Sequence, residues 1–206
     1  YFNITGGTVT VNVKSIIYTV LVLTNRLFTI TSTAGDLYIE VDKISYITLN
    51  NYFNISGGNN NIIIKSILPN DGLLGILFSI TSGTSYFEID SIDIYTSASY
   101  FTITGGNTEI DIKTFNILTT SAVAILFNTS NTTAKYVDIN VNKMLITCST
   151  IVAIVTSNSN INTSNYITIG YLNVAGDLFV DPITPVPVGL FYLQNTIAYL
   201  NIKNAA

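Results

Sequence analysis

Hydrophobic and polar residues alternate with a period of two in several short runs of the chain. In the first run, valines at positions 9, 11 and 13 are separated by Thr10 and Asn12. This alternation, in runs rich in Ile and Val, predicts β-strands with one buried face rather than helices. The clearest runs are residues 9–14, 37–42, 87–90, 110–113 and 137–142.

A longer repeat organises these runs. The string Tyr-Phe-Asn-Ile-Thr-Gly-Gly at residues 1–7 returns in closely related form at 52–58 and 100–106. A similar string that begins with Leu-Phe lies between these copies, at 27–32, 77–82 and, more weakly, 126–130. The period is therefore about 25 residues, with two alternating versions. A fixed period of this size indicates an architecture of stacked repeats.

Each repeat is expected to form one rung of a right-handed parallel β-helix, and each rung is expected to contain three short strands. The strands are the Phe-x-Ile segment, the alternating run, and a third apolar stretch such as 146–148. Glycine pairs between the first two strands supply the positive φ of a turn. A sandwich or an antiparallel barrel is the alternative, but neither requires a similar string every 25 residues or so. We expect one all-β domain, residues 1–206, of about eight rungs aligned on Val13, Val41, Ile64, Ile89, Ile112, Val141, Ile169 and Ile202.

In this alignment, outward-facing residues at equivalent positions of successive rungs form two columns along the stack. The first begins with a ladder of alternating charge and continues with Asn142, Gly170 and Lys203. Its ion pairs would each contribute at most about 1 kcal/mol, but a slip by one rung would place Lys on Lys. The five residues of the charge ladder are Lys14, Asp42, Lys65, Asp90 and Lys113. The second column contains short polar side chains that can hydrogen-bond along the stack. Its members are Asn3, Thr29, Asn54, Ser79, Thr102 and Asn128.

The amino-acid composition argues against several classes of binding partner. Hydrophobic residues make up 48% of the chain and charged residues only 10%, against about 25% charged residues in an average domain. The net charge is −4, and the 8 basic residues form no cluster, which argues against nucleic-acid binding. No apolar run reaches the roughly 18 residues that a membrane-spanning helix needs. The single cysteine excludes an intrachain disulfide.

The residues of common active sites are scarce. The chain has no histidine, which removes histidine general bases and Ser-His-Asp chemistry, and Arg26 is its only arginine. Glu88 and Asp111, on adjacent rungs, could reach the 5 to 9 Å or so between the carboxylates of a glycosidase. Together with Glu40 they could form a weak Ca²⁺ site, but Ile63 interrupts that column. A solvated face with lysine partners is favoured, so we expect no catalytic, cofactor or metal site.

Three irregular features bear on partners. The insertion at residues 175–189, with Pro182, Pro185 and Pro187, predicts a surface loop, an end cover or a contact loop. The first rung is already regular at Tyr1, whereas terminal repeats normally differ in order to cap a stack. We therefore expect the chain to be a segment whose first rung abuts another protein subunit or the remainder of a longer chain. Asn-x-Ser/Thr glycosylation sequences occur at Asn3, Asn54, Asn128, Asn131 and Asn162.

The regular rungs and the bias toward Asn, Ile, Thr and Tyr resemble the repetitive β-helix proteins of large DNA viruses, phage tailspikes and bacterial surface adhesins. The architecture is also similar to the pectin-lyase-like superfamily. This resemblance implies a non-enzymatic structural rod of a virion or of an extracellular surface. The alternative is a glycan-binding adhesin or receptor-binding spike, and a polysaccharide-degrading enzyme is less favoured. The residues expected to contact a glycan are Tyr38, Tyr86, Tyr166 and Tyr199.

Overall fold

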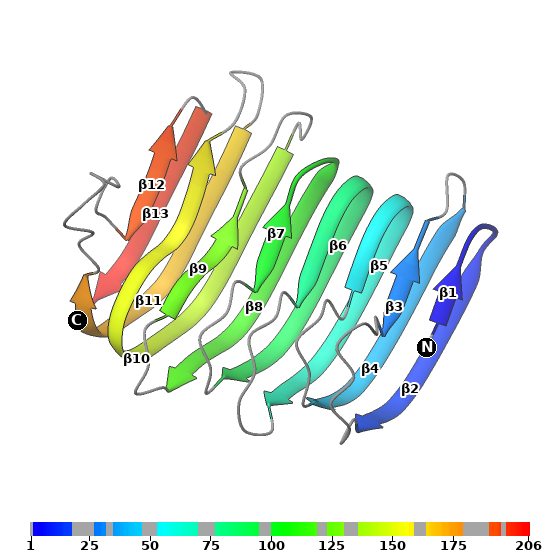
Figure 1. Ribbon diagram of the computed structural model, residues 1–206, viewed down its shortest axis with the longest axis horizontal. Coiled ribbons are helices and arrows are strands. Elements are labelled where there is room, and N and C mark those ends of the chain that lie inside the picture. The colour runs from blue at the N-terminus through cyan, green and yellow to red at the C-terminus, as the bar shows by residue number, and fades with distance from the viewer. Residues whose placement is uncertain are drawn as a thin grey trace.

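The chain folds as a parallel β-solenoid. The computed structural model describes residues 2–17, 27–31, 35–46, 53–69, 77–94, 100–118, 123–129, 136–158, 164–178, 190–194 and 197–206. Within these ranges the only regular secondary structure is β-strand, and every strand pair is parallel (Figure 1). The predicted all-β parallel β-helix is therefore confirmed.

The described strands form two faces of the solenoid. Short strands of the Phe-x-Ile type line one face and long curved strands line the other, while β5, β6 and β10 run through both (Figure 1). The strands are β1 (Phe2–Ile4), β2 (Val9–Ile17), β3 (Phe28–Ile30), β4 (Asp36–Tyr46), β5 (Phe53–Pro69), β6 (Phe78–Ile94), β7 (Phe101–Ile103), β8 (Asn107–Leu118), β9 (Val123–Asn128), β10 (Tyr136–Asn158), β11 (Ser164–Leu178), β12 (Phe191–Gln194) and β13 (Ile197–Ala205).

Strand register follows the alignment of the sequence repeats. Val13 on β2 pairs with Val41 on β4, and the same column continues without a shift to Ile202 on β13. Because the apolar positions repeat at matching places, this register keeps every apolar set on the inner side. The column contains Val13, Val41, Ile64, Ile89, Ile112, Val141, Ile169 and Ile202.

The structure merges the predicted second and third strands of each rung into one bent strand. In β4, Val41 and Ile44 are buried, and the two residues between them both face outward. Two successive outward residues turn the backbone through a corner, and pairing resumes at Lys43, which lies opposite Ser15. The corner thus changes the direction of the chain without ending the ladder of hydrogen bonds.

Aromatic rings stack through the core on the side of the short strands. Neighbouring rings of this phenylalanine column lie 4.5 to 5.1 Å apart between centroids and are nearly parallel. Burial of each ring stabilises the fold by about 1.5–3 kcal/mol, and offset stacking adds to this. The column consists of Phe2, Phe28, Phe53, Phe78, Phe101 and Phe127.

Glycines stack at the turn between the two faces. The predicted positive φ of the glycine pairs is confirmed, and the second glycine of each pair carries it. A Cβ at Gly106 would lie 2.2 Å from the carbonyl oxygen of Gly83 on the neighbouring rung, so the backbone of the two turns approaches too closely for a side chain at Gly106. Gly35 and Gly83, in the rungs that carry the Leu-Phe string, also have positive φ, and this was not predicted from the sequence. The glycines with positive φ are Gly7, Gly35, Gly58, Gly83 and Gly106.

A buried amide supports one of these turns from inside. Asn60 is only 4% exposed, and its Nδ2 donates to the carbonyl oxygen of Gly57 at 2.9 Å and to Ser85 Oγ at 3.3 Å. Ser85 and Thr108 continue the same inward column on the next two rungs. These small polar side chains fill the narrow space beneath the turn, where the backbone carbonyls need donors.

Part of the predicted insertion is regular structure. Residues 175–178 belong to β11, and residues 179–189 lie outside the described ranges. Arg26 and the glycosylation sequences at Asn131 and Asn162 lie outside them too. In the part of the chain that the structure describes, no helix is long and apolar enough to cross a membrane.

Candidate functional site

The outer side of the long strands carries three columns of polar residues. The tyrosine column comprises Thr10, Tyr38, Asn61, Tyr86, Glu109, Asp138, Tyr166 and Tyr199. The carboxylate column comprises Asn12, Glu40, Ile63, Glu88, Asp111, Asn140, Thr168 and Asn201. The corner column, one residue beyond the aligned apolar position, comprises Lys14, Asp42, Lys65, Asp90, Lys113, Asn142, Gly170 and Lys203.

The corner column forms two separate ion-pair groups. Lys65 pairs with Asp42 on the preceding rung, and its Nζ lies 4.0 Å from Glu40 Oε1. Hydrogen bonding to Asp42 and then the charge of that carboxylate raise the pKa of Lys65. The lysine is about half exposed, so this contact with solvent keeps its contribution to stability small.

The second group repeats the first two rungs further along. Lys113 Nζ lies 2.5 Å from Asp90 Oδ1 and 3.9 Å from Glu88 Oε1. The hydrogen bond to Asp90, followed by the charge of Asp90, raises the pKa of Lys113. In both groups the lysine binds a Glu-x-Asp pair on the rung before it.

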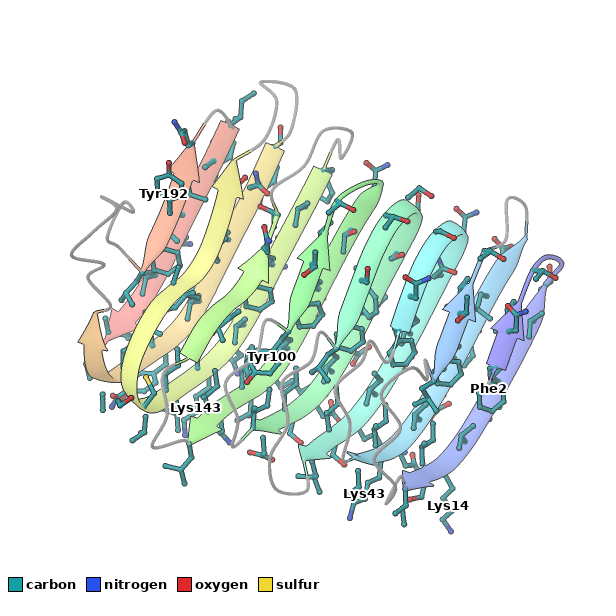
Figure 2. The ribbon with its side chains drawn as sticks, viewed as in Figure 1. Phe2, Lys14, Lys43, Tyr100, Lys143 and Tyr192 are labelled. Atoms are coloured by element: carbon teal, nitrogen blue, oxygen red, sulfur yellow. The ribbon has the colours of Figure 1, made fainter. Side chains whose placement is uncertain are left out.

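The lysines at the two ends of the corner column are not part of these groups. Lys14 and Lys203 make no ion pair with any of the described residues. Figure 2 shows Lys14 projecting from the corner of β2, away from the interior into which Phe2 and Tyr100 point. The five residues of the predicted ladder therefore lie in one column, but only four of them are joined.

Two of the tyrosines in the tyrosine column donate hydrogen bonds to the carboxylate column. Tyr38 Oη donates to Glu40 Oε2 at 3.3 Å, and Tyr86 Oη donates to Asp111 Oδ2 at 3.2 Å. Burial, the charge of Asp111 and this hydrogen bond raise the pKa of Tyr86 to about 12. Burial and then the charge of Glu40 raise the pKa of Tyr38. Hydrogen bonds hold both hydroxyls in place, so the ring faces are the part of these side chains that remains available for contact with a ligand.

Three tyrosines gather toward the C-terminal end. The rings of Tyr166 and Tyr199 are stacked with centroids 4.8 Å apart, and Tyr136 tilts against Tyr166 at 5.5 Å. Tyr199 is 57% exposed. The four tyrosines expected to bind glycan therefore share one column but form one contacting pair, Tyr166 and Tyr199, with acidic or amide residues between the others.

Carboxylates meet in the middle of this outer surface. Glu109 lies opposite Asp138, and Glu88 lies opposite Asp111. Burial, then the charges of Asp111 and Asp138, raise the pKa of Glu109. No set of three or more acidic or cysteine side chains in the described ranges is arranged to hold a metal ion. The raised pKa of Glu109 thus reflects its burial first and the two neighbouring carboxylates second.

A shallow groove begins where the corner column loses its alternating charge. Its volume is about 430 Å³, and Asn142 and Gly170 give it a floor of small residues between Lys113 and Lys203. Sequence reasoning did not identify this groove, although the change from charged to small residues after Lys113 marks it. The remaining lining residues are Tyr86, Glu88, Asp111, Ile112, Asn140, Val141 and Thr168.

Comparison with known proteins yields no matching family model, no matching curated protein and no matching solved structure. The fold therefore defines a class, the parallel β-solenoids, without a specific family.

Proposed function

We propose that the chain is a non-enzymatic structural rod that serves as a spacer or fibre segment of a virion or of an extracellular surface. The regular core supports this function, because the same apolar columns run through every described rung. On the outer side, Lys65 and Lys113 pair with carboxylates of the preceding rung, and the hydroxyls of Tyr38 and Tyr86 donate to carboxylates. Such a body can extend in length by adding further rungs.

The observation that carries this proposal is the state of the two ends. Val9, Val11 and Val13 on β2 are only partly buried, whereas their neighbours on β4 are buried. At the other end, Leu200 on β13 is 44% exposed although its partner in the register, Ile167, is 1% exposed. Both end strands also have an edge that no described strand pairs. Open edges of this kind favour addition of further strands.

Assembly of the purified chain tests the structural function. Negative-stain electron microscopy and light scattering over a range of concentrations should show filaments or defined oligomers. Leu200→Asp, which places a charge in the apolar end, should reduce assembly strongly. Asn201→Asp is the matched control, since its side chain points to the outer face and it should assemble as the parent does. A chain that stays monomeric at all concentrations would overturn the proposal.

The groove favours glycan binding as a second candidate function. Amide and hydroxyl side chains of Asn140, Asn142 and Thr168 line the groove together with Tyr86, a combination of groups that can hydrogen-bond to sugars and stack on them. A glycan array probed with the chain tests this. Asn140→Lys should fill the groove and abolish any binding, whereas Asn12→Lys, in the same column on the first rung, should leave it intact. Absence of binding to any glycan would remove this candidate.

A further inference from the structure

A second groove lies on the outer side, near the start of the long strands. Its volume is about 360 Å³, and its exposed walls are mainly apolar. Tyr38 and Tyr86 both line it, and Asn61 lies between them in the tyrosine column. These three residues come from β4, β5 and β6, and the sheet continues to β2 on one side and to β8 on the other. They therefore lie within the stack rather than at an end of it.

Rings in the tyrosine column face along the stack. Tyr166 and Tyr199, on adjacent rungs, have ring centroids 4.8 Å apart and an interplanar angle of 4°. Tyr38 and Tyr86 occupy the same column but are two rungs apart. At about 4.8 Å per rung, this places them about 9.6 Å from each other. Adjacent rings of the column thus leave no space between them, whereas rings two rungs apart do.

Hydrogen bonds draw the hydroxyls of both rings away from this space. Tyr38 donates to Glu40 on its own strand, and Tyr86 donates to Asp111 on the following rung. Asn61, the residue between them, is exposed and is much shorter than a tyrosine. Tyr38, Asn61 and Tyr86 therefore form a slot with two ring faces as its walls and an amide as its floor, which we call the tyrosine slot.

The surroundings of the tyrosine slot are negatively charged. Burial is the largest cause of the raised pKa of Tyr38 and of Tyr86, and the charge of Glu88 contributes to both. Asp36 is exposed and lines the same groove. Along the strands, the carboxylate column lies next to the tyrosine column, and the lysines of the corner column lie beyond it. This arrangement of charge favours a cationic ligand over an anionic one.

The spacing of the rings matches a cation of a particular kind. A cation midway between them would lie about 4.8 Å from each ring, within the roughly 6 Å over which an aromatic face attracts a cation. A quaternary ammonium group has methyl groups in place of N–H donors, so it can contact apolar walls without leaving a donor unsatisfied. A primary ammonium group has three donors to satisfy, and the amide of Asn61 supplies one acceptor.

We propose that the tyrosine slot binds a quaternary ammonium group, such as the trimethylammonium group of choline. The two rings would lie on opposite sides of the group, and the surrounding carboxylates would complement its charge. The slot is separate from the groove at Asn142 and Gly170, although Tyr86 lines both. This inference goes beyond the proposed function and does not depend on it.

Titration with choline tests the inference. Isothermal titration calorimetry of the intact chain should give a Kd on the order of 1 mM. The control ligand is the neutral alcohol in which a carbon atom replaces the nitrogen of choline, because it has the same shape without the charge. It should bind about tenfold more weakly, since attraction to the ring faces requires the charge.

Variants of the chain assign binding to the tyrosine slot. Asn61→Tyr should abolish binding, because a third ring would fill the gap, and Asn61→Ser should retain it. Tyr38→Leu should weaken binding about fivefold. Tyr166→Leu is the matched control, because Tyr166 belongs to the same column but stacks directly on Tyr199, and it should bind choline as the parent does. Circular dichroism checks that each variant keeps its β-structure.

Vesicles distinguish a free ligand from a lipid headgroup that carries the same group. Sedimentation of the chain with phosphatidylcholine vesicles, but not with phosphatidylglycerol vesicles, would support a headgroup as the ligand. Binding of choline without sedimentation would support a free ligand. Three results would overturn the inference: no binding of choline, equal binding of choline and its neutral analogue, or unchanged binding in Asn61→Tyr.

Discussion

Glycine is required at the turn between the two faces for two separate physical reasons. The first is backbone conformation, since Gly7 has a φ of +80° and nothing lies within 4 Å of a Cβ built there. The second is the distance between rungs, since a Cβ at Gly106 would lie 2.2 Å from a neighbouring carbonyl oxygen. Gly6 meets neither condition. Substitutions at Gly6, Gly7 and Gly106 can therefore distinguish the cost of backbone strain from the cost of a steric clash between rungs.

The loss in the free energy of unfolding on substitution by alanine should increase with the number of these two requirements that apply at the position. Gly6→Ala should leave the free energy of unfolding within about 0.5 kcal/mol of the parent. Gly7→Ala should lower it by about 1–2 kcal/mol, because a non-glycine residue is strained at positive φ. Gly106→Ala should lower it further. Urea unfolding of the three variants measures this ranking, and equal values for Gly7→Ala and Gly106→Ala would contradict the collision.

The sequence predicts this glycine column only in part. The Gly-Gly pairs lie in the conspicuous Tyr-Phe strings, and their positive φ follows from the turn. Gly35 and Gly83 are single glycines in rungs where the string has diverged. Their role depends on the carbonyl oxygens of the neighbouring rung, and only the stacked structure brings those atoms close.

At the scale of the element, each bent strand is defined by the pattern apolar-polar-polar-apolar. Val41 and Ile44 show it in β4, and Ile64 and Ile67 show it in β5. Strict alternation before the corner allowed the register to be predicted residue by residue. The corner was predicted as a break between strands, because two successive outward residues interrupt the period of two. Hydrogen bonding to both neighbouring rungs holds the strand together through the bend.

The phenylalanine column should stabilise central rungs more than the first. Phe78 is 0% exposed and lies between Phe53 and Phe101, whereas Phe2 is partly buried and, among the described rings, stacks only on Phe28. Phe78→Ala should therefore lower the free energy of unfolding by about 3–5 kcal/mol, and Phe2→Ala by less. Chemical denaturation checks this difference, with the m-value as a test of two-state unfolding. Equal losses would show that the rungs do not depend on both neighbours.

The environment of Glu109, through burial first and neighbouring carboxylates second, predicts that the stability of the fold depends on pH. The pKa of Glu109 is raised, so its contribution to stability is fully present below the ordinary pKa of glutamate and is lost as pH rises through the folded value. Glu109→Gln should therefore stabilise the chain at pH 7 by less than about 1 kcal/mol, since the group is largely solvated. This gain over the parent should shrink near pH 3.5.

Thermal melting at the two pH values measures the effect. Glu88→Gln serves as the matched control, because Glu88 lies 3.9 Å from Lys113 and loses an attractive partner. It should not stabilise the chain at pH 7. A stabilising effect of the same size in both variants would point to net negative charge rather than to the local cluster.

At the scale of the whole molecule, the solenoid behaves as a one-dimensional stack in which each rung contacts only its neighbours. The central rungs, in β5, β6 and β8, have a rung on either side. The end strands β2 and β13 have one neighbour each among the described strands, and the apolar residues of both are partly exposed. Stability of such a stack is a sum of rung and interface contributions, so opening begins at the ends.

Amide hydrogen exchange should reveal this gradient. We expect the strongest protection in β5, β6 and β8, and the weakest in β2 and β13, when the chain is dilute. Mass spectrometry of peptic fragments measures this gradient. Uniform protection in the dilute chain would contradict opening from the ends.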